Sequence, residues 1–237
     1  MKKPTLMQNI GKKPKWQRFA LDTVIPQKSS ILRLMGVPAD KRKAIESVDE
    51  PFAKAVEIFM EKANPRGGHC ICDPKLVASA LFAHSQQSKL YERLLAADVC
   101  ALFLVTVGDG PENEAVRLLN AGEYLLGTVL DTLASEAAEC VVDKVQADVV
   151  RALELEKAVR FSPGYGGWSL QAQPELLGAM YAEENGIGLT EALMMLPKKS
   201  VSGVIVPQRA GVSNTPCDMC ELKSCPQESC WEKKTED

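Results

Sequence analysis

The chain has 237 residues, of which 46% are hydrophobic and 25% are charged, and its net charge is −3 at pH 7. This composition is typical of a globular protein with a sizeable core, and the net negative charge argues against non-specific nucleic-acid binding. No apolar run approaches the length of a membrane span, so we expect neither nucleic acid nor a membrane among the partners.

The two ends of the chain differ in composition from its middle. Residues 1–19 are basic and lack the apolar segment of a secretory signal, so we expect a flexible or surface-docked arm there. We expect one domain over residues 20–210 and a separate tail over residues 211–237. Four of the eight cysteines lie in this tail, which is typical of a metal site rather than of a secreted disulfide framework. This cysteine usage favours a reducing cytoplasm.

Helical patterns begin the domain. A short helix is expected to end at Gly36, because glycine commonly follows the last helical turn. A second helical region restarts near Pro51 and extends to Asn64. The glycines and proline in residues 65–68 break the helical pattern there.

Strands and long helices alternate in the middle of the chain. Residues 69–72 are short enough to be a buried strand, and Asp73 followed by proline predicts a helix that runs to about Ala97. Residues 99–107 are almost continuously apolar and predict a central strand. Residues 126–155 repeat apolar side chains at steps of three and four, which predicts a helix of about eight turns that braces the segment after it.

A ligand-friendly stretch comes after this long helix. Arg160 can hold a carboxylate or phosphate by two parallel hydrogen bonds, and Tyr165 and Trp168 offer flat faces to an adenine ring or a cation. Pro163 fixes the backbone, and Gly164 permits a close approach of a ligand. An ordinary turn with its aromatic rings in the core is the alternative.

The last part of the domain returns to short elements. Pro174 begins a helix, and residues 189–195 predict a short helix capped by Thr190. Residues 198–206 predict a strand on which Ser200 and Ser202 share one face. Gly203 leaves the opposite face open, so we expect a ligand or partner to have room there.

Three segments together resemble the activation domain of cobalamin-dependent methionine synthase. They are the arginine-to-tyrosine turn, a segment some twenty residues further on, and the serine-rich strand, which read RFSPGY at 160–165, IGLTEALMMLP at 187–197 and SVSG at 200–203. The apolar strand that ends at Gly108 and the long helix after it also lie where that family has them. The resemblance covers residues 20–207.

The resemblance implies an α+β fold with a twisted, mainly antiparallel sheet and long helices. It also implies S-adenosylmethionine binding, with Arg160 on the methionine carboxylate, the Ser162 backbone near the adenine or ribose, and Tyr165 packed near the ligand. The residues expected to bind this cofactor are Arg160, Ser162, Pro163, Gly164, Tyr165, Ser200 and Ser202.

The same resemblance implies the activity and the partners. In that family, cobalamin oxidised to the cob(II) state is reduced by one electron and remethylated from S-adenosylmethionine. The catalytic and cobalamin-carrying domains are absent from this sequence. We therefore expect a free-standing relative that serves a separate corrinoid-binding methyltransferase protein, with a reductase, ferredoxin or flavodoxin as a further candidate partner. The chain would then be one component of a cobalamin-dependent methyltransferase.

The tail places four soft ligands within a short span, at Cys217, Cys220, Cys225 and Cys230. Thiolates this close repel one another unless a cation or oxidation neutralises them, so we expect metal binding. Four cysteines suit either zinc or an iron–sulfur cluster. A role in reducing cobalt favours the cluster. By contrast, we expect Cys70 and Cys72 to be small core residues and His69 to be a satisfied or exposed imidazole.

Three functions therefore stay open. The first is reductive activation and remethylation of a corrinoid methyltransferase with S-adenosylmethionine, in methionine synthesis or a related pathway. The second is an iron–sulfur or zinc redox partner of a corrinoid protein that does not bind S-adenosylmethionine. Residues 207–211 favour this alternative, because the family has a tyrosine soon after its serine-rich strand and this chain has none there. The third is a module that only caps or stores a corrinoid.

Overall fold

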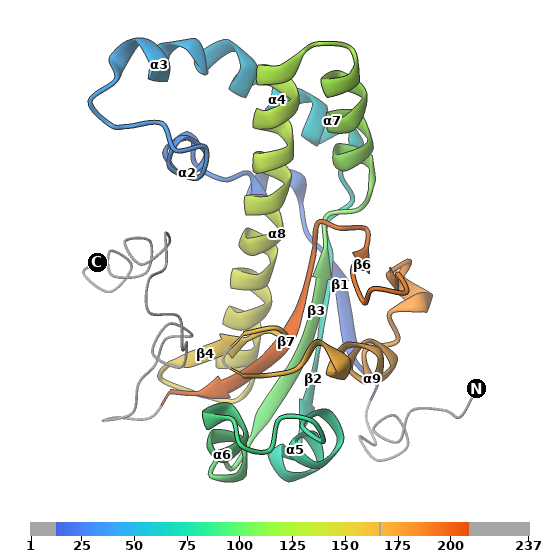
Figure 1. The fold of residues 1–237 in the computed structure, drawn as a ribbon. Helices are drawn as coiled ribbons and strands as arrows, with labels where there is room; N and C mark the ends of the chain where they lie inside the picture. The colour runs from blue at the N-terminus through green and yellow to red at the C-terminus, as the bar shows by residue number, and fades with distance from the viewer. Residues whose placement is uncertain (1–12, 166, 209–237) are drawn as a thin grey trace.

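A five-stranded sheet with helices on both faces organises the computed structural model, which describes residues 13–165 and 167–208 (Figure 1). All neighbouring strands are antiparallel, which confirms the expected α+β class with a mainly antiparallel sheet and long helices. In spatial order the strands are β1 (Lys15–Arg18), β2 (Arg66–Cys72), β3 (Cys100–Thr106), β7 (Ser200–Pro207) and β4 (Ala158–Phe161).

The central strand β3 separates two apolar cores. All seven of its residues are buried, as its continuous apolar run predicts. Successive side chains point to opposite faces of a strand, so Leu102 and Leu104 enter one core while Phe103 and Val105 enter the other. The sheet is therefore covered on both sides, and its two outer strands, β1 and β4, form the edges.

One face of the sheet is covered by the helix α8 (Tyr124–Ala152), whose 29 residues confirm the long periodic segment. Its buried stripe includes Leu133, Val141 and Val145. Outside it pack α4 (Asp49–Lys62), α7 (Gly110–Asn120) and α2 (Lys28–Leu34), with the 3₁₀ turn η1 (Leu21–Val24) nearby and α3 (Arg42–Ser47) against α4. Figure 1 shows α8 running from the α4 and α7 end of the molecule to β4.

Three shorter helices cover the other face, namely α5 (Pro74–Leu81), α6 (Lys89–Leu95) and α9 (Gln173–Ala179). The expected single helix from Asp73 to Ala97 is wrong, because it divides into α5 and α6. Asp73 does cap the first helix by accepting from the Lys75 amide at 2.8 Å. Ser88 caps the second by accepting from the Tyr91 amide at 3.2 Å, and this second cap restarts the chain in a new direction.

The sheet extends further at its β1 edge than expected. β2 begins at Arg66, so Gly67 and Gly68 are strand residues rather than a break, and Lys15–Arg18 of the expected arm pair with β2. Both glycines allow close packing. A Cβ on Gly68 would lie 2.7 Å from the Trp16 ring, and a Cβ on Gly67 would lie 2.8 Å from Val145 on α8.

The expected short helix over residues 189–195 is also wrong. Those residues form the two-stranded ribbon of β5 (Gly188–Leu189) and β6 (Met195–Leu196). The Thr190 hydroxyl accepts from the Met194 amide at 3.1 Å, and Leu193 has a positive φ of 61°. The hydroxyl thus closes a tight turn where we expected it to begin a helix.

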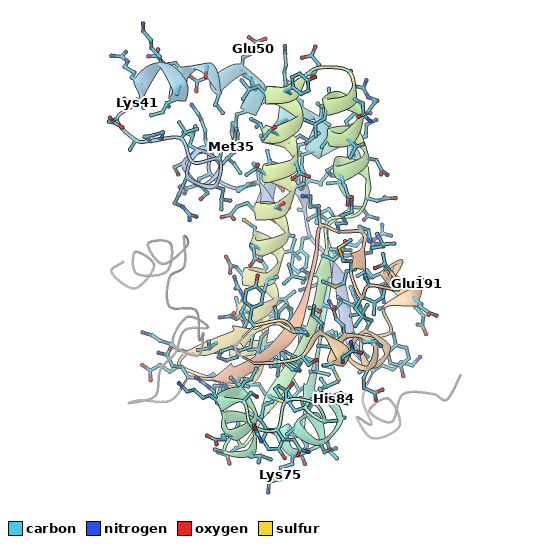
Figure 2. All side chains as sticks on the ribbon, viewed as in Figure 1. Met35, Lys41, Glu50, Lys75, His84 and Glu191 are labelled. Carbon is cyan, nitrogen blue, oxygen red and sulfur yellow. The ribbon has the colours of Figure 1, made fainter. Side chains whose placement is uncertain are left out.

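Two short 3₁₀ turns complete the described chain, η2 (Leu170–Ala172) and η3 (Glu183–Asn185). Figure 2 shows Glu50 and Lys41 at one end of the molecule and Lys75 at the other, beyond the sheet. Over the residues that the structure describes, no helix combines the length and the apolar character that a membrane crossing requires. The tail over residues 211–237 and residues 1–12 of the arm lie outside the described residues.

Candidate functional site

Arg160 lies on the edge strand β4 and turns toward α8. It pairs in register with Ile205 of β7, whose side chain enters the core under α8. Its guanidinium contacts three side chains of that helix: Nη1 lies 2.5 Å from Oδ1 of Asp143 and 3.3 Å from Oε1 of Gln146, and Nη2 lies 3.0 Å from Oε2 of Glu139. The Arg160 side chain is only 20% exposed. Its charge is therefore already neutralised by two carboxylates.

The partners of Arg160 on α8 are residues that the sequence interpretation missed. Glu139, Asp143 and Gln146 are four and three residues apart, which places them on one face of a helix. That spacing is readable from the sequence. Only the pairing of β4 with β7 shows that this polar face of α8 lies against Arg160.

The loop after β4 is closed by its own backbone. The Gly164 amide donates to the Trp168 carbonyl at 2.7 Å, the Tyr165 amide donates to the Ser162 carbonyl at 3.2 Å, and the Trp168 amide donates to the Tyr165 carbonyl at 3.0 Å. Gly164 has a φ of 95°, a conformation that suits glycine. Pro163 is buried, whereas the Tyr165 ring is 65% exposed. The loop therefore presents Tyr165 at the surface.

Trp168 belongs to the core rather than to a ligand surface. Its ring is 1% exposed and stacks on Phe82, with centroids 4.8 Å apart and planes 10° apart. Its Nε1 donates to the Leu81 carbonyl at 3.1 Å. Of the two aromatic residues that the sequence singles out in this stretch, only Tyr165 is accessible.

The two serines of β7 lie on the opposite face of the sheet from Arg160. Ser200 donates to the Pro197 carbonyl at 2.6 Å. The Ser202 hydroxyl is buried with no hydrogen-bond partner in the described part of the chain, and the same holds for Oε1 of Gln173 at the start of α9. These residues face the core under α5, α6 and α9, so the structure does not gather the serines and Arg160 in one cleft.

The space opposite the serines is filled. A Cβ on Gly203 would overlap the Phe161 carbonyl oxygen and would lie 2.7 Å from Cε1 of Phe103. The expected open face is therefore wrong, since the Phe103 ring occupies the volume that the glycine leaves.

The cysteines and histidine of the sheet are core residues. Cys70, Cys72 and Cys100 are buried, and burial raises the pKa of the Cys100 thiol to about 12. Burial lowers the pKa of His69, which is 8% exposed in β2. Within residues 13–165 and 167–208, no group of three or more histidine, cysteine or acidic side chains is placed to hold a metal ion. Cys217, Cys220, Cys225 and Cys230 lie outside the described residues.

Comparison with known proteins gives one family and one fold. The family model described as "Vitamin B12 dependent methionine synthase, activation domain" matches residues 91–211. A solved structure titled "Crystal Structure of the MetH Reactivation Domain bound to AdoHcy" aligns with a TM-score of 0.61 and 15% sequence identity, over 84% of this chain and 80% of that chain. No curated protein sequence matches the chain. At this identity the structural likeness carries the fold alone.

Proposed function

Because the chain belongs to the vitamin B12 dependent methionine synthase activation family, we propose that it returns an inactive corrinoid methyltransferase to its methylated state. The observation that carries this proposal is that the family match spans the Arg160 turn, the Tyr165 loop and the serine strand together. In the reaction, one external electron reduces cob(II)alamin, and S-adenosylmethionine supplies the methyl group to cobalt and leaves as S-adenosylhomocysteine.

We propose Arg160 as the residue that binds the carboxylate of S-adenosylmethionine. Its planar guanidinium can hold a carboxylate by two parallel hydrogen bonds. In the present arrangement Asp143 and Glu139 hold those donors, at 2.5 Å and 3.0 Å. Their side chains are 59% and 44% exposed, so water can solvate them after they separate from Arg160. The ligand carboxylate would therefore replace at least one of them.

The loop from Ser162 to Tyr165 forms the rest of the proposed ligand surface. Its exposed Tyr165 ring offers an apolar face to the adenosyl group, and the Ser162 backbone lies at the start of the turn. Pro163 and Gly164 hold the turn in shape. A ring placed this way would also shield the methyl-donating sulfonium from water.

Ser200 and Ser202 lie apart from Arg160 and Tyr165, so their part in ligand binding is considered separately. Ser202 has a buried hydroxyl without a partner in the described chain, which is a reason to expect a polar group from a ligand there. One ligand that touches both Arg160 and Ser202 would have to pass around the edge strand β4. We therefore assign the primary contacts to Arg160 and Tyr165 and treat Ser202 as a second contact.

The proposed partner is a corrinoid-binding methyltransferase protein, because an activation domain of this family serves cobalamin that another module carries. The electron would come from a reductase, ferredoxin or flavodoxin. The solved reactivation domain is bound to AdoHcy, the product that our reaction releases, and this supports the choice of methyl donor. Buried thiols such as Cys72 and Cys100 suit a reducing cytoplasm.

Calorimetric titration of the full chain with S-adenosylmethionine tests the proposal. We expect saturable binding that Arg160→Ala weakens by at least about tenfold, as loss of a charged hydrogen-bonded partner does. Arg151→Ala is the matched control, because Arg151 belongs to α8, pairs with Asp148 and is 78% exposed. Equal affinities in the wild type and Arg160→Ala would refute the assignment of Arg160.

The cysteine spacing of the tail favours a second component of the function. We propose that Cys217, Cys220, Cys225 and Cys230 bind an iron–sulfur cluster or zinc, and that a cluster would relay the electron. Anaerobic purification followed by iron, sulfide and zinc analysis decides between them. A metal-free protein with four reactive tail thiols would remove this component and the redox-partner alternative with it.

A further inference from the structure

Arg18 and Arg66 lie directly opposite each other in the antiparallel pair of β1 and β2. Side chains at opposed positions share one face of a sheet with their Cβ atoms close together, and like charges placed there are destabilising. Neither arginine has a carboxylate within ion-pair distance among residues 13–165 and 167–208. The pairing thus concentrates positive charge at this end of the sheet.

A hollow of about 520 Å³ lies beside this arginine pair. Its size lies within the range of pockets that hold small metabolites. Its lining comes from strand β1, from β2 and the segment just before it, and from the turn η3, and it includes Trp16, Arg18, Asn64, Arg66, Glu184 and Asn185. The two positive charges therefore face a volume that a ligand can enter.

Arg66 is held in place by neutral groups. Its Nε donates to the Asn185 carbonyl at 2.9 Å, and its Nη1 donates to the Asn64 carbonyl at 3.1 Å. Gly186 has a φ of 67°, and a Cβ there would lie 3.1 Å from Nη2 of Arg66. The guanidinium is thus fixed against the η3 turn without a counter-ion in the described chain. Burial and the neighbouring Arg18 lower the pKa of Arg66, while Asp109 acts in the opposite sense.

Trp16 supplies an apolar wall to the same hollow. Its indole lies over Gly68, and its Nε1 donates to the Met180 carbonyl at 3.0 Å. The ring is therefore held in one orientation. Glu184 also lines the hollow but is exposed at the surface, where it is available to a positively charged part of a ligand.

We propose that Arg18 and Arg66 bind the oxyanion group, phosphate or carboxylate, of a small ligand whose apolar part packs on Trp16. Two opposed guanidinium groups, of which that of Arg66 is held by two carbonyls, suit an oxyanion that accepts several hydrogen bonds at once. The site differs from the proposed S-adenosylmethionine surface, because β1 and β4 are the two opposite edges of the sheet. It is a second ligand site of the domain and does not depend on the proposed function.

Titration of the full chain with inorganic phosphate and with citrate at low ionic strength tests this site, one probe for each oxyanion class. We expect saturable binding of at least one probe, and the tighter probe identifies the class. Arg18→Gln should weaken it at least about tenfold, because it removes a charged donor. Arg18 is exposed, so this variant keeps the fold. Arg66→Lys, which keeps the charge but loses the fork, should also weaken binding.

Arg33→Gln is the matched control, since Arg33 is an exposed arginine of α2 outside the hollow. It removes the same charge and should leave the affinity within about twofold, because distant surface charges are screened. Equal weakening by Arg33→Gln and Arg18→Gln would reduce the effect to net charge and overturn the proposal. Absence of saturable binding of both probes to the wild-type chain would overturn it as well.

Discussion

Phe103 and Gly203 lie opposite each other in β3 and β7, and the phenylalanine ring occupies the space that the glycine leaves. A Cβ at position 203 would overlap the Phe161 carbonyl oxygen and press on the Phe103 ring. Gly203 therefore fixes how closely β4 lies against β7, and with it the position of Arg160.

Gly203→Ala should lower the free energy of unfolding by about 1–3 kcal/mol, the usual cost of overpacking a core. It should also weaken S-adenosylmethionine binding, because β4 would have to shift. Urea unfolding and calorimetry measure the two effects. Gly188→Ala is the control, since a Cβ there would meet nothing within 4 Å. A Gly203→Ala protein as stable as Gly188→Ala would contradict this tight packing of β4 on β7.

The carboxylates on α8 compete with the proposed ligand for Arg160. Glu139→Gln and Asp143→Asn should therefore each tighten S-adenosylmethionine binding by about two- to fivefold, which corresponds to roughly 0.4–1 kcal/mol and lies within the range of an exposed ion pair. Calorimetric titration provides the affinities. Glu136→Gln removes one charge from the same helix at a position outside the three side chains that contact Arg160, and it should change little. Weaker binding in Glu139→Gln or Asp143→Asn would mean that these residues help to hold the ligand.

Substitutions of Trp168 and Tyr165 should affect different properties of the protein, although both residues lie in one loop. The first should lower stability and the second should weaken ligand binding. Trp168→Ala removes a buried, stacked indole and should cost about 3–5 kcal/mol of unfolding free energy. Tyr165→Ala changes an exposed ring and should cost less than about 0.5 kcal/mol while it weakens S-adenosylmethionine binding. Thermal or urea unfolding and calorimetry are measured on both variants. The reverse pattern would show that the ligand packs on Trp168.

The buried His69 should make the fold sensitive to mild acid. Burial lowers its pKa below the ordinary 6.5, so the unfolded chain takes up a proton more readily than the folded one. The stabilisation from neutral His69 is complete above about pH 6.5 and is lost as the pH falls through that value toward the lowered pKa, by at most about 1.4 kcal/mol per pH unit.

Urea unfolding between pH 7 and pH 5 measures this effect. His69→Gln should flatten the pH dependence, whereas His84→Gln should retain it. The sequence has only these two histidines, and His84 is exposed near the α5 end of the molecule (Figure 2). An equally steep loss of stability in His69→Gln would assign the pH dependence to other groups.

The pattern of apolar residues along the sequence is enough to predict the elements that carry a strong local signal. The apolar run of β3 and the stripe along α8 are strong local signals, and both elements lie where they were expected. The segment from Asp73 to Ala97 suggests one helix because its helical apolar spacing continues past Phe82. In the structure α5 ends just before Phe82, whose buried ring stacks on Trp168. No local pattern encodes a partner 86 residues away in the chain.

The sequence indicates part of the candidate site but not its geometry. The Arg160 and Tyr165 motif is readable from the sequence, whereas the face that Arg160 occupies depends on its register with Ile205. A shift of one residue would have turned it toward the serines. The sequence does not predict the edge strand β1, because the strand has only four residues and only Trp16 among them is partly buried. Such a short alternation of apolar and polar side chains does not stand out from the basic residues around it.

The helix α8 has 29 residues, so at 1.5 Å per residue it is a rod about 43 Å long. The carboxylates that hold Arg160 and the surface that packs on α4 and α7 are parts of this one rod. A ligand that drew Arg160 away from α8 would remove the polar link between β4 and this helix, while the apolar stripe would still hold α8 on the sheet. One rigid helix therefore connects the proposed methyl-donor site with the surface around α4 and α7, so a partner that packs on that surface would contact the same helix that holds Arg160.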